Sequence, residues 1–246
     1  MNLVDLQGKR ALITGGGTGT GRGIALALAA QGCHVAVTGR REDVLKQTAA
    51  LGPDDPHILY RTADVSDRDD VRQLFDWLAD AIGPIDILVN SAGINVKDRA
   101  VKDLSAEDFD RLLEINCTGT YNTIFAVLPQ MRERQDGLII NINSIAGLRA
   151  SMLAGVGYST AKFAMTALAR CVANEEGDHG IRVTTIFPGE INTPILDQRP
   201  KPVSDERKAT LLQPEELGAT VVYLAQLPPN AHVAELVIKP VRQSFS

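Results

Sequence analysis

Tyr158 and Lys162 have side chains and a spacing that could support proton transfer. On a helix, residues i and i+4 lie on one face, so the phenol and the ammonium would be neighbours. An ammonium about 4 Å away, at an effective dielectric of about 20, favours the phenolate by about 4 kcal/mol, or roughly three pKa units. We therefore expect the pKa of Tyr158 to fall from about 10 to near 7, where a general acid or base works best. The spacing alone also occurs by chance in unrelated helices.

The elements that must position this pair follow from an alternation of short apolar runs with longer segments of helical period. This alternation is typical of successive strand–helix units and a parallel sheet. The expected fold class is α/β, with a Rossmann-type, doubly wound, mainly parallel seven-stranded sheet and helices on both faces. We expect a single domain over residues 1–246, with strands at 10–14, 34–38, 57–62, 85–90, 138–143, 182–187 and 235–238.

Six helical segments are expected between the strands, at 21–31, 41–51, 67–82, 105–135, 158–176 and 214–226. Gly119 argues against one unbroken helix over 105–135, because glycine weakens a helix interior. Residues 190–213 contain prolines and show no clear period. Loops of that length in compact domains are usually lids or substrate loops.

A glycine-rich turn, T-G-G-G-T-G-T-G at 14–21, joins the first expected strand to an apolar helical segment. Glycines at this place let the backbone approach a diphosphate, and the N–H groups of the following helix complement its charge. The spacing T-G-x-x-x-G-x-G resembles that of the short-chain dehydrogenase/reductase family, although Thr20 stands where isoleucine is usual. The resemblance implies cofactor contacts from Gly15, Gly17, Thr18, Gly19, Thr20 and Gly21.

The end of the second expected strand indicates which nicotinamide cofactor fits. An acid there accepts from the ribose 2′-OH of NAD(H), whereas an arginine accommodates the 2′-phosphate of NADP(H). This strand is followed by Gly39, Arg40 and Arg41. Guanidinium groups match phosphate geometry, so NADP(H) is favoured over NAD(H). One of the two arginines would then be only the solvated start of a helix.

Other segments match motifs of the same family at the ends of later strands. Asp64-Val65 matches the adenine contact, and N-S-A-G at 90–93 matches Asn-Asn-Ala-Gly, with Ser91 in place of the second asparagine. A Pro-Gly pair and a threonine after the sixth strand match residues that face the nicotinamide carboxamide. The resemblance adds the cofactor-binding residues Asp64, Val65, Asn90, Ala92, Gly93, Tyr158, Lys162, Pro188, Gly189 and Thr193.

The resemblance also implies roles for four catalytic residues, Asn116, Ser144, Tyr158 and Lys162. Tyr158 would be the general acid in reduction and the base in oxidation, and Ser144 would orient the substrate carbonyl. Lys162 would lower the pKa of Tyr158 and bind the nicotinamide ribose. Asn116 would hold a water near Lys162; equally, it could be a buried asparagine that bridges backbone in a kinked helix. The spacing from Ser144 to Tyr158 is one residue longer than is common in the family.

The expected function is an NADP(H)-dependent oxidoreductase that interconverts a carbonyl and an alcohol by hydride transfer. A catalytically inert NADP(H)-binding regulator on the same fold is the alternative. The cofactor-binding half would cover about 8–143, and the catalytic and substrate part about 144–246. The C-terminus lacks the family's frequent Asp-Gly-Gly and is weakly similar to that of NADP-dependent 3-hydroxy acid dehydrogenases and aldehyde reductases. The expected substrate wall is Asn95, Val96, Leu148, Arg149, Met152, Glu190, Ile195 and Leu196.

The composition indicates which kinds of partner the protein does not bind. The net charge is −5 with scattered lysines and arginines, which does not favour nucleic acid. There is no secretion signal and no apolar stretch of 18 residues, so we expect a cytoplasmic protein that does not enter membranes. The three cysteines and four histidines lack metal-ligand spacing, so no metal is expected. The family resemblance implies a homo-oligomer, a tetramer or a dimer, built through the helices after strands four and five.

Overall fold

The chain folds around one parallel sheet in the computed structural model, which describes residues 3–243. The strand order is β3-β2-β1-β4-β5-β6-β7, and every pairing is parallel. The fold class expected from the sequence is therefore confirmed. The strands are β1 (Arg10–Thr14), β2 (His34–Gly39), β3 (Leu59–Thr62), β4 (Ile87–Asn90), β5 (Gly137–Ile142), β6 (Ile181–Pro188) and β7 (Glu235–Ile238).

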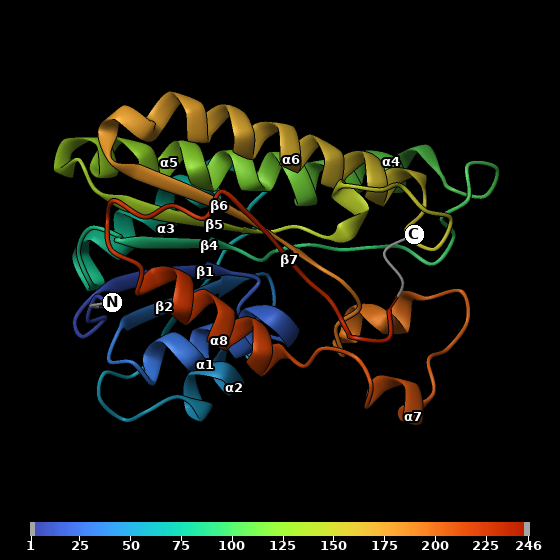
Figure 1. The fold of residues 1–246 in the computed structure, drawn as a ribbon, viewed down its shortest axis with the longest axis horizontal. Helices are drawn as coiled ribbons and strands as arrows, with labels where there is room; N and C mark the ends of the chain where they lie inside the picture. Colours follow the sequence, from blue (N-terminus) through green and yellow to red (C-terminus); the bar gives the residue numbers. More distant parts are fainter. Residues whose placement is uncertain (1–2, 244–246) are drawn as a thin grey trace.

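Helices cover both faces of the sheet (Figure 1). One face carries α1 (Gly19–Ala29), α2 (Glu42–Leu51) and α8 (Pro214–Ala225). The other carries α3 (Arg68–Ala81), α5 (Gly119–Arg134) and α6 (Val156–Glu176), with α4 (Ala106–Leu113) packed beside α6. Each layer buries a separate apolar core.

Adjacent residues of β1 show how the strands serve both cores. Ile13 is buried among the residues under α1 and α8, whereas Leu12 is buried among those under α3, α5 and α6. Successive side chains of a strand point to opposite faces, so a central strand must be apolar at every position. This is why the central strands are continuous apolar runs in the sequence.

The segment 105–135 differs most from a simple helix. It forms α4, a π-helical segment η1 (Glu114–Thr118) and α5. The expectation of a break is confirmed, and the break lies at Asn116 and its neighbours, just before Gly119. A π-helical turn inserts one extra residue and often marks a functional site.

The segment 190–213, here called the lid segment, contains more structure than the sequence suggests. It holds a short 3₁₀ helix, η4 (Pro194–Gln198), and one turn of helix, α7 (Asp205–Lys208). Its two ends are joined by a bridge between Ile191 and Leu212. The other element ends lie within two residues of expectation; α1 and α6, for example, begin two residues earlier, at Gly19 and Val156.

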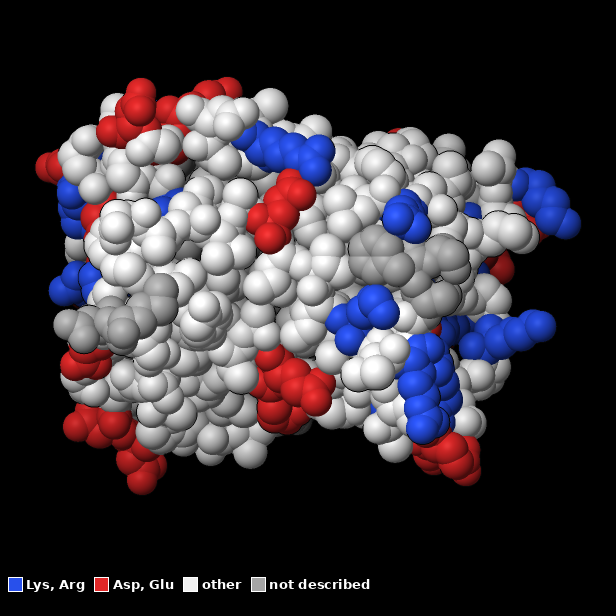
Figure 2. Space-filling view, in the orientation of Figure 1, with Lys and Arg blue, Asp and Glu red and all other residues white. Residues whose placement is uncertain are grey.

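The order in which strands are added reverses at β1: β2 and β3 lie on one side of it, and β4 to β7 lie on the other. The loops that follow β1 and β4 therefore diverge and leave a crevice, which is where open α/β sheets bind ligands. On the face shown in Figure 2, basic side chains gather toward the end of the molecule that carries α7. No helix within residues 3–243 is both long and apolar enough to cross a bilayer.

Candidate active site

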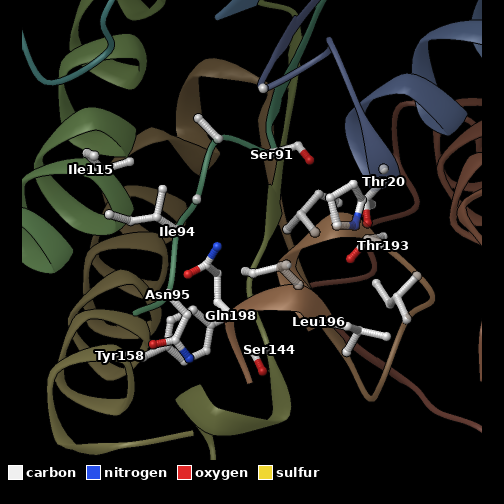
Figure 3. Close-up of a pocket in the computed structure, with 18 of the residues that line it drawn as sticks. Thr20, Ser91, Ile94, Asn95, Ile115, Ser144, Tyr158, Thr193, Leu196 and Gln198 are labelled. Atoms are coloured by element: carbon white, nitrogen blue, oxygen red, sulfur yellow. The ribbon is translucent and has the colours of Figure 1, made fainter. Parts of the chain in front are cut away.

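A cavity of about 1470 Å³ opens at the carboxyl ends of the strands. Ligand pockets commonly measure about 300–1,000 Å³, so this one has room for two ligands side by side. Most site residues expected from the sequence line it: Gly15, Gly17, Thr18, Gly19, Thr20, Gly21, Arg40, Arg41, Asp64, Val65, Ala92, Gly93, Ser144, Tyr158, Lys162, Pro188, Gly189 and Thr193. Figure 3 shows Thr20, Ser91 and Thr193 at one end and Tyr158 and Ser144 at the other.

The glycine-rich turn is packed too tightly for side chains. A Cβ on Gly15 would lie 2.8 Å from the Cα of Ala92, and one on Gly21 would overlap the carbonyl oxygen of Gly15. The first turn of α1 contains no acid, and the Thr18 side chain does not cap it. A helix of this kind presents unpaired N–H groups at its start. The turn thus fits an anionic group such as a diphosphate, which was the expectation.

Asn90 lies behind the cavity wall instead of facing the cavity. Its side chain is buried, donates to Oδ1 of Asn141 over 3.0 Å and accepts from the Thr123 hydroxyl over 2.6 Å. It is absent from the residues that line the cavity. The Asn90 side chain therefore links β4 to β5 and α5 and does not face the expected cofactor. The N–H groups of Ser91 and Ala92 donate to the Thr14 hydroxyl instead.

Arg40 and Arg41 follow β2 at the rim of the cavity, and both are exposed. Asp64 lies on the same rim, where Ser66 donates to it through both its N–H and its hydroxyl. Partial burial alone would raise the pKa of Asp64, but these hydrogen bonds and the charge of Arg40 outweigh it and lower the pKa. Arg40 is thus close enough to Asp64 to act on its charge.

Ser144 and Tyr158 meet at the opposite end of the cavity. Ser144 follows β5 and accepts from the Ala146 N–H over 3.1 Å, which fixes its hydroxyl at the start of a 3₁₀ turn. Tyr158 lies in the first turn of α6, and Ser144 forms a side-chain hydrogen bond with it. One turn further, Lys162 places Nζ 5.6 Å from the centre of the Tyr158 ring and donates to the carbonyl of Ile142 over 3.1 Å.

The expected pKa of Tyr158 near 7 is wrong for this structure. Burial raises the pKa of Tyr158 to about 12, although Ser144 and the charge of Arg99 act in the opposite direction. Burial also lowers the pKa of Lys162 to about 8. Desolvation penalises the charged form of each group. The groups that lower the pKa of Tyr158 are Ser144 and Arg99, and not Lys162 as expected from the helix spacing. At neutral pH the phenol therefore keeps its proton.

Asn116 anchors the loop after β4. Its Oδ1 accepts from the Ile94 N–H over 3.2 Å, and its Nδ2 donates to the carbonyls of Ile94 and Leu112 over 3.1 and 2.9 Å. The side chain is fully buried in the π-helical segment. These contacts are those of the second interpretation, an asparagine that bridges backbone in a kinked helix. A Cβ on Gly93 would lie 2.8 Å from Asn116 Oδ1, so the loop passes close by.

Six of the eight residues expected in the substrate wall line the cavity. Leu148 and Met152 do not; Met152 is 97% exposed because the loop before α6 turns it outward. Glu190, which does line the cavity, forms ion pairs of 3.1 Å with Arg199 and Arg207. The residues of the wall are Asn95, Val96, Arg149, Glu190, Ile195 and Leu196.

Arg99 is a cavity residue that the sequence did not reveal. Its guanidinium donates to the carbonyls of Val96, Leu153 and Gln198 over 3.0, 2.6 and 2.5 Å. These acceptors belong to three segments: the loop after β4 that contains Arg99 itself, the loop after β5, and η4 in the lid segment. Because all three acceptors are backbone carbonyls, which every residue type has, no sequence motif predicts this role.

Known proteins resemble the chain over nearly its whole length. The short chain dehydrogenase family profile matches residues 9–203. An uncharacterized oxidoreductase of Staphylococcus saprophyticus is 34% identical over 241 residues, covering 97% of this chain and 100% of that protein.

Two solved structures are also similar. An alcohol dehydrogenase from Thermococcus sibiricus, complexed with 5-hydroxy-NADP, has a TM-score of 0.86 and 29% identity, covering 96% of this chain and 98% of that one. The closed form of a serine dehydrogenase, complexed with NADP+, has a TM-score of 0.85 and 30% identity, covering 96% of each chain.

Proposed function

Because this chain belongs to the short-chain dehydrogenase/reductase family of oxidoreductases, we propose that it interconverts a carbonyl and an alcohol with NADP(H). The observation that carries the proposal is the single cavity that joins the glycine-rich turn to Ser144, Tyr158 and Lys162. A dinucleotide seated on the turn would extend toward these side chains. In this reading residues of about 8–143 bind most of the cofactor, and about 144–246 supply the reaction and substrate groups.

The side chains at the Tyr158 end suit the handling of one proton. Bound nicotinamide supplies or accepts the hydride. Tyr158, whose pKa is about 12, holds its proton at Oη at neutral pH and donates it to the oxygen of a carbonyl undergoing reduction. The hydroxyl of Ser144, already hydrogen-bonded to Tyr158, orients that oxygen. In the oxidation direction Tyr158 accepts the proton of the alcohol.

Lys162 places an amino group beside the phenol, and the charge of this group changes with pH near neutrality. With its pKa near 8, the ammonium is the main form at neutral pH. It donates to the Ile142 carbonyl and retains further N–H groups for ribose hydroxyls. Asn116 acts through the loop at 93–94, which it holds against this end of the cavity, instead of touching the reacting atoms.

NADP(H) is the proposed cofactor in preference to NAD(H). Arg40 and Arg41 stand at the rim where a 2′-phosphate would lie, and Gly39 occupies the place of the acid that would bind a free 2′-OH. Both solved structures described above contain NADP-type ligands. Arg40 is the stronger candidate, since its charge already acts on Asp64 at the same rim.

We further propose that the protein is a homo-oligomer that uses the outer faces of α5 and α6. Tyr121 and Phe125 stack on α5 and are 41% and 66% exposed, and Phe163 on α6 is 43% exposed. Exposed aromatic groups of this kind mark interfaces. Light scattering after size-exclusion chromatography will show a dimer or tetramer, and a monomer at micromolar concentration would reject this proposal.

The test of the function is reduction of a panel of aldehydes, ketones and quinones with NADPH and with NADH. We expect faster oxidation of NADPH and a loss of at least 1,000-fold in kcat for Tyr158→Phe, about 4 kcal/mol of barrier, with unchanged NADPH affinity. Tyr223→Phe, on the exposed face of α8, is the matched control. Tight NADPH binding with no turnover of any carbonyl would instead favour the inert regulator.

A further inference from the structure

The charge of the cavity differs in sign from that of the whole chain. The chain carries 25 Lys and Arg against 30 Asp and Glu. The residues that line the cavity include eight Lys or Arg and five Asp or Glu. Basic side chains also gather at the same end of the molecule in Figure 2. A cleft with an excess of one charge concentrates ligands of the other, so the cavity is suited to anions.

Part of this positive charge lies toward the Tyr158 end of the cavity, away from the rim where Arg40 and Arg41 lie. Arg99 is 8% exposed and lines the cavity. Its three hydrogen-bond partners are uncharged carbonyl groups. Within residues 3–243, no carboxylate forms an ion pair with it. A buried cation of this kind lacks the counter-charge that normally offsets its desolvation.

The neighbouring carboxylates are unsuited to supply that counter-charge. Glu190 is already shared by Arg199 and Arg207. Asp98 and Asp197 line the cavity but are exposed to solvent. Burial lowers the pKa of Arg99, and the charge of Arg199 acts in the same direction. The place for an anion beside Arg99 is therefore left to a ligand.

Tyr158 is the link between this place and the reaction. The charge of Arg99 acts on Tyr158 directly, and Figure 3 shows Asn95 and Gln198, whose loops are held by Arg99 and its neighbours, beside Tyr158. Both residues line the same cavity, and Arg99 also donates to the carbonyl of Leu153, in the loop that leads into α6 and Tyr158. An anionic group bound at Arg99 and a carbonyl bound at Tyr158 could thus belong to one small molecule.

We infer that the substrate carries a carboxylate that binds Arg99, so that the substrates are short oxo acids and hydroxy acids. The inference rests on the proposed function. In reduction, a hydride from NADPH adds to the carbonyl carbon, the C=O π bond breaks, and the oxygen takes the proton of Tyr158. The products are the hydroxy acid and NADP+, and the carboxylate itself is unchanged.

The test compares each acid with its uncharged ester. Oxidation by NADP+ is measured for 2-, 3- and 4-hydroxy acids and for their methyl esters. For the wild-type protein we expect kcat/KM to be at least 100-fold higher for one acid than for its ester. An ester that reacts as fast as its acid at every chain length, in an active enzyme, would overturn the inference and leave the proposed function intact.

Arg99→Gln separates charge recognition from a purely structural clamp. The variant loses bonds to three loops, so both substrates will react more slowly, but the acid-to-ester ratio should fall to below tenfold. An equal loss for acid and ester would show that Arg99 only holds the loops together. Lys102→Gln, an equal charge change at an exposed site of the same loop outside the cavity, is the control and should keep the ratio.

A binding measurement keeps the inference testable without turnover or a folded variant. Butanoate and butanamide have nearly the same shape and differ in charge. NMR titration of the wild-type protein, with and without NADP+, should show binding of butanoate at least tenfold tighter than that of butanamide. Equal affinities would reject the carboxylate site even if the carbonyl panel failed, and selective binding would support it in that case.

Discussion

Replacement of Lys162 by methionine should stabilise the protein while it removes activity. Burial lowers the pKa of Lys162 from 10.5 to about 8, and the residue is 3% exposed. A shift of one unit corresponds to about 1.36 kcal/mol. Below pH 7 the folded protein must carry the ammonium in this place, at a cost of about 3 kcal/mol. Loss of the hydrogen bond to the Ile142 carbonyl offsets about 1 kcal/mol of the gain.

The sign of the pH dependence follows from the depressed pKa. A group whose pKa is lower in the folded state penalises folding fully below the folded value, and the penalty disappears as pH rises toward the unfolded value. For Lys162 the penalty is about 3 kcal/mol at pH 6, about 2 kcal/mol at pH 9 and small above pH 10.5. The difference in free energy of unfolding between Lys162→Met and the wild type should therefore shrink as the pH rises.

Urea unfolding of both proteins at pH 6, 7, 8 and 9, at one protein concentration, measures this difference. The free energy of unfolding of Lys162→Met should exceed that of the wild type by about 2 kcal/mol at pH 6, and by about 1 kcal/mol less at pH 9. A difference that is constant over this range, or that grows with pH, would refute the assignment of a depressed pKa to Lys162.

Three further outcomes follow from the structure. Arg40→Ala should weaken NADPH binding at least tenfold more than NADH binding in fluorescence titrations, and equal effects would reject the 2′-phosphate assignment. Gly21→Ala should lower NADPH affinity at least 100-fold because its Cβ overlaps the backbone of the same turn, whereas Gly177→Ala, with nothing within 4 Å, should not. Arg132→Ala should lower the midpoint of urea unfolding, since it leaves the carboxylate of Glu176, 2% exposed, without its ion pair; an unchanged midpoint would contradict this.

The fold could be predicted because its signals are local. The apolar run at 138–143 and the glycine-rich turn at 14–21 each define an element or a turn within a few residues. Parallel strands then place the ends of β1, β4 and β5 at one edge of the sheet, which brings Ser144 toward the start of α6 without further information. The family profile and the similar structures are consistent with this.

The electrostatics of the site could not be predicted in the same way. The spacing correctly predicted that Lys162 and Tyr158 lie on one face of a helix. The pKa of a phenol, however, also depends on how much water its surroundings exclude. The exclusion of water depends on how segments distant in sequence fold around Tyr158, which local spacing does not encode. Asn116 is a similar case, because its acceptors on Ile94 and Leu112 come together only where the helix is π-helical.

Arg99 shows why a sequence can predict the class of reaction more readily than the substrate. Ser144, Tyr158 and Lys162 lie at the end of a strand and on a helix, so their spacing in sequence reflects their spacing in space. Arg99 binds carbonyls 54 and 99 residues away, at Leu153 and Gln198. Any residue type can provide such carbonyls, so the sequence at positions 153 and 198 gives no sign of this contact. Its meaning therefore depends on the folded loops, and the acid-to-ester ratio of Arg99→Gln is the measurement that separates a binding site from a clamp.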